Sequence, residues 1–142
     1  MKDLNELARD AYNIARDNGW HEERGISTDG LKAFGVAFAD MWAGTQIALI
    51  QSELSEALEA IRENRRADLS KFYENITIGA GGYGFRLAFD RCIKDTLEDE
   101  LADTIIRILD FAKAKDIDIQ RHVDLKMKYN TYRPLRHGGK RF

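Results

Sequence analysis

The chain contains a single proline, Pro134, in 142 residues. Proline lacks a backbone N–H and its ring clashes with the preceding turn, so proline interrupts helices. The first 133 residues carry no such interruption. Apolar residues recur there at three- and four-residue steps over long stretches, which is the period of amphipathic helices. Together these features predict an all-α protein.

The composition fits one soluble domain that spans residues 1–142 and buries a core of its own. Hydrophobic residues make up 44% and charged residues 32% of the chain, and the net charge is −2. Such a balance argues against a nucleic-acid partner, because dedicated nucleic-acid binders are usually basic. The lone Cys92 cannot form a disulfide within the chain, which fits a reducing compartment. Without a transmembrane-length apolar run or a secretion signal, we expect a cytoplasmic protein with no membrane partner.

Four helices are expected, over about residues 3–18, 31–65 and 88–115 and from about 118 to just before Arg133-Pro134. Asn18-Gly19 is a natural stop for the first. The second has room for a bend at Gly35 or Gly44. In the third, residues 101–112 are apolar nearly all round, which places this helix in a larger core or against another subunit. The predicted core stripe of the second helix is Ile47, Ile50, Leu54, Leu58 and Ile61.

The segment 67–90 differs from the rest of the chain. A β-prone run at residues 76–78 leads into Gly79, Gly81, Gly82 and Gly84. Four glycines in six positions disfavour a helix, because glycine loses more backbone freedom on folding than any other residue. The segment is therefore predicted to be a glycine-bearing loop or short β-hairpin inserted between the second and third helices.

Two acidic pairs occur at helical spacing, Glu53-x-x-Glu56 and Glu100-x-x-Asp103. A three-residue step on a helix puts both side chains on one face, with Cβ atoms about 5–6 Å apart. The flanking residues are apolar, and buried carboxylates need partners or a metal. Two such helices facing each other would gather four oxygen ligands, which suits Mg²⁺, with Mn²⁺ as the alternative.

Two other interpretations of the polar and aromatic residues are weaker. A redox di-iron bundle normally brings Glu-x-x-His motifs, and here His21, His122 and His137 all lie outside the acidic pairs. Trp20 and Trp42 are candidates for lining a nucleobase pocket, although tryptophan more often serves in a core or an interface.

Basic residues concentrate near the C-terminus. Lys126, Asn130 and Arg133 follow a three- to four-residue rhythm, so they share a helix face, and Lys140 lies in the basic stretch beyond them. In a chain that is acidic overall, this charge points to an anionic ligand, although a basic tail can simply aid solubility. A triphosphate is the logical ligand, since a metal bridges phosphate oxygens and the basic groups neutralise the remaining charge.

With the motif Glu53-x-x-Glu56, the motif Glu100-x-x-Asp103 and the ending Lys126-Met-Lys-Tyr-Asn130-Thr-Tyr-Arg133-Pro-Leu-Arg-His-Gly-Gly-Lys140-Arg-Phe in view, the chain resembles the MazG-like all-α nucleotide pyrophosphohydrolases. Asn18-Gly19-Trp20 also looks familiar for this group. The sequence departs from the family pattern at Ser52, where a further glutamate is common. It also has a longer connection between the motifs, residues 57–99.

The resemblance implies a four-helix arrangement and hydrolysis of nucleoside triphosphates to the monophosphate and pyrophosphate. Magnesium would be held by Glu53, Glu56, Glu100 and Asp103, with Glu53 as the residue that activates water. The basic residues Lys126, Arg133 and Lys140 would stabilise negative charge, and Asn130 would hydrogen-bond a sugar or base. The resemblance also implies a homodimer or homotetramer. Deoxynucleotides or phosphoribosyl-ATP are alternative substrates, and a non-catalytic nucleotide-sensing or adaptor module is the alternative function.

Overall fold

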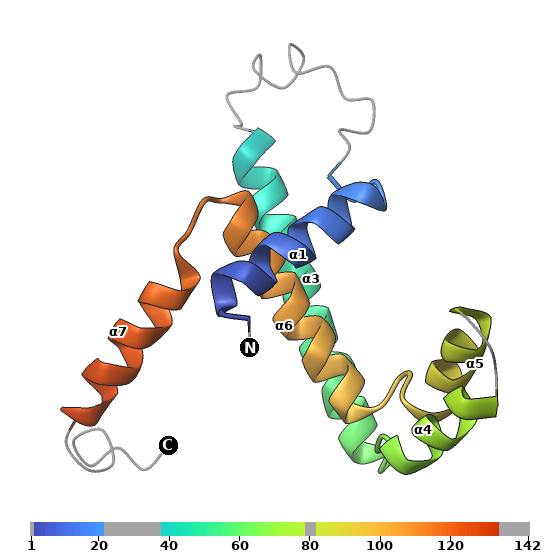
Figure 1. The fold of residues 1–142 in the computed structure, drawn as a ribbon. Coiled ribbons are helices and arrows are strands. Elements are labelled where there is room, and N and C mark those ends of the chain that lie inside the picture. Colours follow the sequence, from blue (N-terminus) through green and yellow to red (C-terminus); the bar gives the residue numbers. More distant parts are fainter. Residues whose placement is uncertain (1, 22–37, 79–81, 134–142) are drawn as a thin grey trace. The chain divides into compact units, whose positions relative to one another are not determined.

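The computed structural model describes residues 2–21, 38–78 and 82–133, and only the backbone of residues 38–40, 77 and 78. Within these residues all regular structure is α-helical, which confirms the predicted all-α class (Figure 1). The described residues form six helices, where the sequence predicts four. The chain divides into two compact units, residues 23–108 and residues 1–22 with 109–142. None of the described helices is long and apolar enough to cross a membrane.

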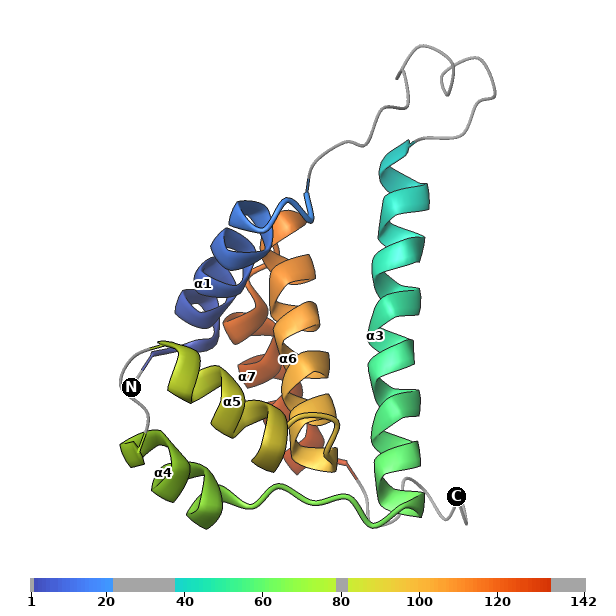
Figure 2. The same cartoon turned by 90° about the vertical axis from the view of Figure 1, so that its right-hand side faces the viewer.

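The unit of residues 23–108 contains α3 (Phe38–Arg62), α4 (Leu69–Ile78), α5 (Gly82–Cys92) and α6 (Leu97–Ala114) as far as Ile108. Within it, α6 runs antiparallel to α3 (Figure 2). The buried residues of α3 are Ile50, Glu53, Ala57 and Ala60, at steps of three and four residues that define one helix face. Glu53 therefore lies in the middle of a face that is otherwise apolar.

The predicted core stripe of α3 is wrong except at Ile50. Its other four members are between 45% and 56% exposed. Both faces of α3 are apolar, and periodicity alone does not say which one is covered. The covered face carries two alanines, which allow close packing, together with Glu53, whose charge is met by a guanidinium from α6. The residues left uncovered are Ile47, Leu54, Leu58 and Ile61.

The prediction of a loop or β-hairpin over residues 67–90 is also wrong, because α4 and α5 occupy most of this segment. Both views show the two helices side by side (Figures 1 and 2). Phe72 of α4 is buried and makes edge-on contacts with Phe85 and Phe89 of α5, at ring-centroid distances of 5.4 and 6.4 Å. Tertiary packing of this kind outweighs intrinsic propensity. Gly82 and Gly84 lie in the first turn of α5, where a glycine costs less than in a helix interior; Gly79 and Gly81 fall outside the described residues.

The third predicted helix is two helices in the structure, because α5 ends at Cys92 and α6 begins at Leu97. Asp95 between them has φ 59°, a left-handed conformation that an α-helix does not accommodate. The Thr96 hydroxyl donates to the Ile93 carbonyl at 2.6 Å, which fixes the turn. Neither glycine nor proline marks this break, so the apolar pattern runs through it.

In the other unit, α1 (Leu4–Asp17) and α7 (Ile119–Thr131) begin and end where the sequence predicts. Asp3 caps α1 in a capping box with Glu6, which satisfies backbone N–H groups that have no partner inside the helix. The helix ends at Asn18, and Gly19 follows with φ 77°. Asp118 caps α7, and α7 ends before the proline. The bend predicted at Gly35 lies outside the described residues, and Gly44 lies within the helix α3.

A small apolar core holds this second unit together. Ala8 and Ala11 of α1 pack with Leu109 from the last part of α6, and Leu4 and Ile119 pack against them. The contact is reinforced where the side-chain oxygen of Gln120 accepts from the Leu4 backbone N–H at 3.1 Å. The two short helices are thus joined through apolar contacts and through their capped ends.

Candidate metal centre

Three carboxylates meet where α3 and α6 run past each other. Glu53 lies in the second half of α3, and Glu100 and Asp103 lie near the start of α6. One carboxylate oxygen from each residue lies within 4.8 Å of the others. Glu53 is 7% and Glu100 5% exposed, and Asp103 is the most open to solvent of the three. The helical spacing in the sequence therefore brings these acids together as predicted.

The spacing and chemistry of these oxygens fit a hard divalent cation. Opposite ligands of an octahedral Mg²⁺ lie about 4.2 Å apart, and those of Ca²⁺ up to about 5 Å apart. The carboxylate oxygens lie within 4.8 Å of one another, which is inside the Ca²⁺ distance and slightly beyond the distance for Mg²⁺. Three carboxylates without a sulfur or imidazole ligand suit Mg²⁺ or Mn²⁺ better than a softer metal. The three residues could thus hold a divalent cation, and the choice of Mg²⁺ stays a prediction.

Negative charge is in excess at this centre. Burial first, and then the nearby charges of Glu56, Asp99, Glu53 and Asp103, together raise the pKa of Glu100 to about 7. Burial likewise raises the pKa of Asp103, followed by the charges of Asp99 and Glu53, while Arg107 opposes the shift. Carboxylates that resist ionisation together are stabilised when a cation binds between them.

A single guanidinium from α6 offsets part of this charge. Arg107 Nε donates to Glu53 Oε1 at 2.6 Å, and both side chains are largely buried. A short charge-assisted contact of this kind is stronger than a neutral hydrogen bond. Arg107 thereby fixes Glu53 against α6, a role that sequence reasoning does not assign to it.

Glu56, the fourth predicted ligand, does not join the three-carboxylate group. Its side chain is exposed on α3, three residues from Glu53. Its charge still contributes to the raised pKa values of Glu100 and Asp103, so it lies within electrostatic reach of the centre. The structure thus brings together three of the four predicted ligands and leaves the fourth nearby.

The predicted phosphate-binding residues belong to the other compact unit. Lys126 and Asn130 are exposed on α7, and Arg133 is exposed just after it. Lys126 Nζ lies 5.0 Å from the ring centroid of Tyr129, a cation–π contact. Lys140 lies outside the described residues. The part these four residues play toward an anion stays a prediction.

No imidazole joins the carboxylates in the described part of the chain. His21 Nε2 lies 2.9 Å from Asp110 Oδ1, and its ring centroid lies 4.6 Å from that of Tyr12, all within the unit that holds α1. His122 is on α7 in the same unit. His137 lies outside the described residues.

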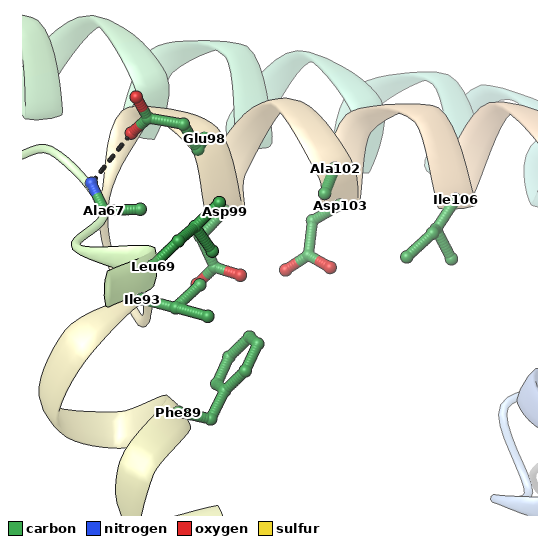
Figure 3. Close-up of a pocket in the computed structure, with 9 residues that line it drawn as sticks. All are labelled: Ala67, Leu69, Phe89, Ile93, Glu98, Asp99, Ala102, Asp103 and Ile106. Atoms are coloured by element: carbon green, nitrogen blue, oxygen red, sulfur yellow. Dashed lines mark hydrogen bonds between the residues drawn. The ribbon is translucent and has the colours of Figure 1, made fainter. Parts of the chain in front are cut away.

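A cavity of about 330 Å³ adjoins the carboxylates on the side of α4 and α5 (Figure 3). It is lined mainly by apolar groups, and the carboxylates of Asp99 and Asp103 point into it together with the ring of Phe89. Sequence reasoning missed Phe89 and Asp99. In the sequence, Phe89 is marked only by its spacing of four residues from Phe85. Asp99 is marked only by its position three residues after Thr96. Trp20 and Trp42 do not line this cavity. The full lining is Ala67, Leu69, Phe89, Ile93, Glu98, Asp99, Ala102, Asp103 and Ile106.

Comparison of the chain with protein-family models, with curated proteins and with solved structures gives no match.

Proposed function

We propose that this protein is a magnesium-dependent nucleoside triphosphate pyrophosphohydrolase of the MazG-like kind, active on intracellular nucleotides in the cytoplasm. The observation that carries the proposal is the convergence of Glu53, Glu100 and Asp103 from two antiparallel helices, with their oxygens within 4.8 Å. The raised pKa values of Glu100 and Asp103 add to it, since perturbed carboxylates cluster at functional sites. The basic residues that the sequence concentrates near the C-terminus favour a phosphate-rich ligand.

The reaction would join a water oxygen to the α-phosphorus of the nucleotide and break the bond from that phosphorus to the α–β bridging oxygen. Pyrophosphate leaves with the electron pair of the broken bond, and the water proton passes to a carboxylate. A Mg²⁺ ion held by these carboxylates would neutralise phosphate charge and make the phosphorus more electrophilic. Glu53, Glu100 and Asp103 would hold the cation, with Glu56 within reach of it.

The sequence suggests Glu53 as the carboxylate that takes up the water proton. Its Oε1 accepts from Arg107 Nε at 2.6 Å, and breaking a largely buried pair is costly. Glu53 is therefore better suited to hold the cation than to take up the proton.

Lys126, Arg133 and Lys140 would balance the phosphate charge, and Asn130 would hydrogen-bond the sugar or base. Arginine and lysine suit this role because they form charge-assisted hydrogen bonds with phosphate oxygens. A homodimer or homotetramer is part of the same proposal. The large apolar side chains left exposed on α3 and α6 support it.

A nucleotide panel with Mg²⁺ tests the activity directly. The purified protein is incubated with ribo- and deoxynucleoside triphosphates in ¹⁸O-labelled water, and the products are separated and weighed by mass spectrometry. We expect monophosphate and pyrophosphate, with the label in the monophosphate because attack occurs at the α-phosphorus. Orthophosphate as the product would contradict the mechanism. Binding without turnover of any nucleotide would favour the adaptor alternative.

Substitutions within the carboxylate group test the site. Glu53→Gln and Asp103→Asn should each lower kcat/KM by about 100-fold, because each removes a charged cation ligand. Glu59→Gln is the matched control, since Glu59 is an exposed acid on the same helix as Glu53 and pairs with Arg62. Full activity in Asp103→Asn would rule out this carboxylate group as the site.

A further inference from the structure

We propose that the cavity between α6 and the α4–α5 hairpin is the nucleobase site, and that it selects bases that carry an exocyclic amino group. This inference rests on the proposed function, since it names the part of the nucleoside triphosphate that enters the cavity. The volume of the cavity, about 330 Å³, lies at the lower end of the range for small-molecule sites. Its mainly apolar lining with few polar groups is also typical of such sites.

The cavity offers an aromatic ring in a fixed orientation. Phe89 of α5 points into the cavity (Figure 3). The ring of Phe85 lies nearly parallel to it at 6.1 Å, and Phe72 meets it edge-on at 6.4 Å. Two aromatic neighbours therefore hold the Phe89 ring in place. Because the ring is already held in place, little conformational entropy is lost when a flat base stacks on it.

The second wall of the cavity supplies a polar contact. Asp99 Oδ2 accepts from the Asp95 backbone N–H at 3.0 Å, and no described residue donates a hydrogen bond to its Oδ1. Glu98 is different, since its two carboxylate oxygens meet the Ala67 N–H at 3.0 Å and the Arg66 guanidinium at 2.9 Å. Asp99 therefore offers a free acceptor toward the cavity, and an ionised carboxylate accepts hydrogen bonds without donating any.

The cavity and the candidate metal centre share Asp103. This side chain contributes an oxygen to the three-carboxylate group and also lines the cavity. A nucleotide whose phosphates lie at the carboxylate group would therefore meet the cavity directly. The segment that builds the far wall, α4 and α5, is also the part of the chain that lies outside the MazG-like motifs. It is therefore the part best placed to set substrate preference.

An amino group is the feature that this wall distinguishes. Cytosine and adenine present an exocyclic NH₂, which donates, whereas uracil and hypoxanthine present a carbonyl oxygen at the equivalent position, which would face the Asp99 carboxylate as a second acceptor. A hydrogen bond to a charged group corresponds to a preference of about tenfold or more. The matched pairs CTP/UTP and ATP/ITP differ in this group and isolate it.

The test compares kcat/KM within each pair for the wild type and for Asp99→Asn. The control is Asp90→Asn, which changes an exposed position of α5. We expect the amino-bearing member of a pair to be preferred by about tenfold in the wild type. Asp99→Asn should bring that ratio close to one, because its amide can still accept from Asp95 while its NH₂ group suits a carbonyl. Asp90→Asn should keep the wild-type ratio. A wild-type ratio near one in both pairs, or an unchanged ratio in Asp99→Asn, would overturn the inference.

Binding of CMP, UMP, AMP and IMP, measured by calorimetry without metal, separates this inference from the proposed function. Phe89→Leu keeps the site apolar but removes the ring, and should weaken binding of the preferred monophosphate about tenfold. If the protein releases pyrophosphate but its base preference does not depend on Asp99, the proposed function is supported and the assignment of this cavity to the base is wrong. If the preference among monophosphates depends on Asp99 but the protein hydrolyses no triphosphate, the assignment of the cavity is supported and the proposed function is wrong.

Discussion

Glu100 carries a carboxylate into a region that already holds those of Glu53 and Asp103, with Asp99 and Glu56 close enough to act on it. The side chain is 5% exposed. Water therefore screens this carboxylate little, and ionising it lowers the stability of the folded protein. Arg107 pairs with Glu53, so it does not remove that cost from Glu100. Such local destabilisation is common at functional sites, where the arrangement serves binding and not stability.

The pKa of Glu100 leads to a prediction on stability in the absence of metal. It is about 7 in the folded protein against an ordinary value of 4.5. Between these values the folded state holds more protons than the unfolded state, so stability falls as pH rises from below 4.5 to above 7. With EDTA present, we expect a higher Tm at pH 5 than at pH 8, and a smaller difference in Glu100→Gln. Asp99 and Asp103, whose pKa values are raised by burial, act in the same direction.

Glu59→Gln serves as the control in these melts, because it changes an exposed acid on α3. A Glu100→Gln variant with the same pH profile as the wild type would contradict the assignment of the raised pKa to this group.

The affinity of the protein for metal should depend on the same protonation of Glu100. A proton on Glu100 competes with the cation, so the apparent affinity for Mg²⁺ should rise as pH increases through about 7. At pH 8, Mg²⁺ should raise the Tm of the wild type and have little effect on Asp103→Asn. Calorimetric titration at several pH values measures the affinity. An affinity that is independent of pH between 6 and 8 would argue against Glu100 as a ligand.

The sequence predicted the acidic residues of the candidate site but not what surrounds them. The ExxE and ExxD spacings were sufficient to find Glu53, Glu100 and Asp103, because helical geometry is local and regular. Arg107 and Phe89 escaped prediction, because their contacts join different helices. No local pattern identifies such partners. Which side of a helix they meet is decided by tertiary packing.

At the scale of elements, α6 presents three faces with different surroundings. Successive residues turn by about 100°, so Glu100, Thr104 and Arg107 form the face that carries the carboxylate and guanidinium contacts. Asp99, Ala102 and Ile106 line the cavity, and Asp103 lies between these two faces. The third face is apolar and exposed, with Leu101, Ile105 and Ile108. The sequence predicted a helix that is apolar nearly all round, but not the division of its surface.

The helix boundaries show where local signals suffice. α1 and α7 are capped by Asp3 and Asp118, and both caps are visible in the sequence. α4 and α5 were missed because glycine and β-branched residues lower helix propensity, while the aromatic contacts that offset this cost are not local. The break at Asp95 was missed because aspartate, although it adopts the left-handed conformation more readily than most residues, also occurs within helices and does not by itself mark a break.

The aromatic contacts make the α4–α5 hairpin sensitive to Phe72. This side chain is 6% exposed and contacts both Phe85 and Phe89. Phe72→Ala should cost about 3–5 kcal/mol, because it removes a buried ring and leaves a cavity. Hydrogen exchange should then accelerate in peptides from α4 and α5, since this hairpin opens locally. Glu74→Ala, an exposed position on the same helix, should leave the exchange unchanged. Equal protection in both variants would show that other contacts hold the hairpin.

At the scale of the whole molecule, apolar surface is left uncovered on two long helices. On α3 it comprises Ile47, Leu54, Leu58 and Ile61, and on α6 it comprises Leu101, Ile105 and Ile108, all at least 39% exposed. Spacings of three, four and seven residues place each set on one helix face. Contiguous apolar patches on soluble proteins usually mark interaction sites. The sequence showed that these residues were apolar, but it could not show that the chain alone leaves them exposed.

We therefore expect the chain to self-associate through these faces, as the proposed homodimer or homotetramer requires. Burying apolar area stabilises association by about 25 cal/mol per Å² before the costs of binding are met. A charge within the α3 face should oppose this, so Leu54→Glu should shift the protein toward monomer in sedimentation velocity at micromolar concentration. Ala48→Glu adds the same charge at an exposed position about 120° around the helix from Leu54 and should keep the wild-type sedimentation coefficient. A wild-type protein that sediments as a monomer at every concentration would contradict the expectation, as would a Leu54→Glu variant that remains associated.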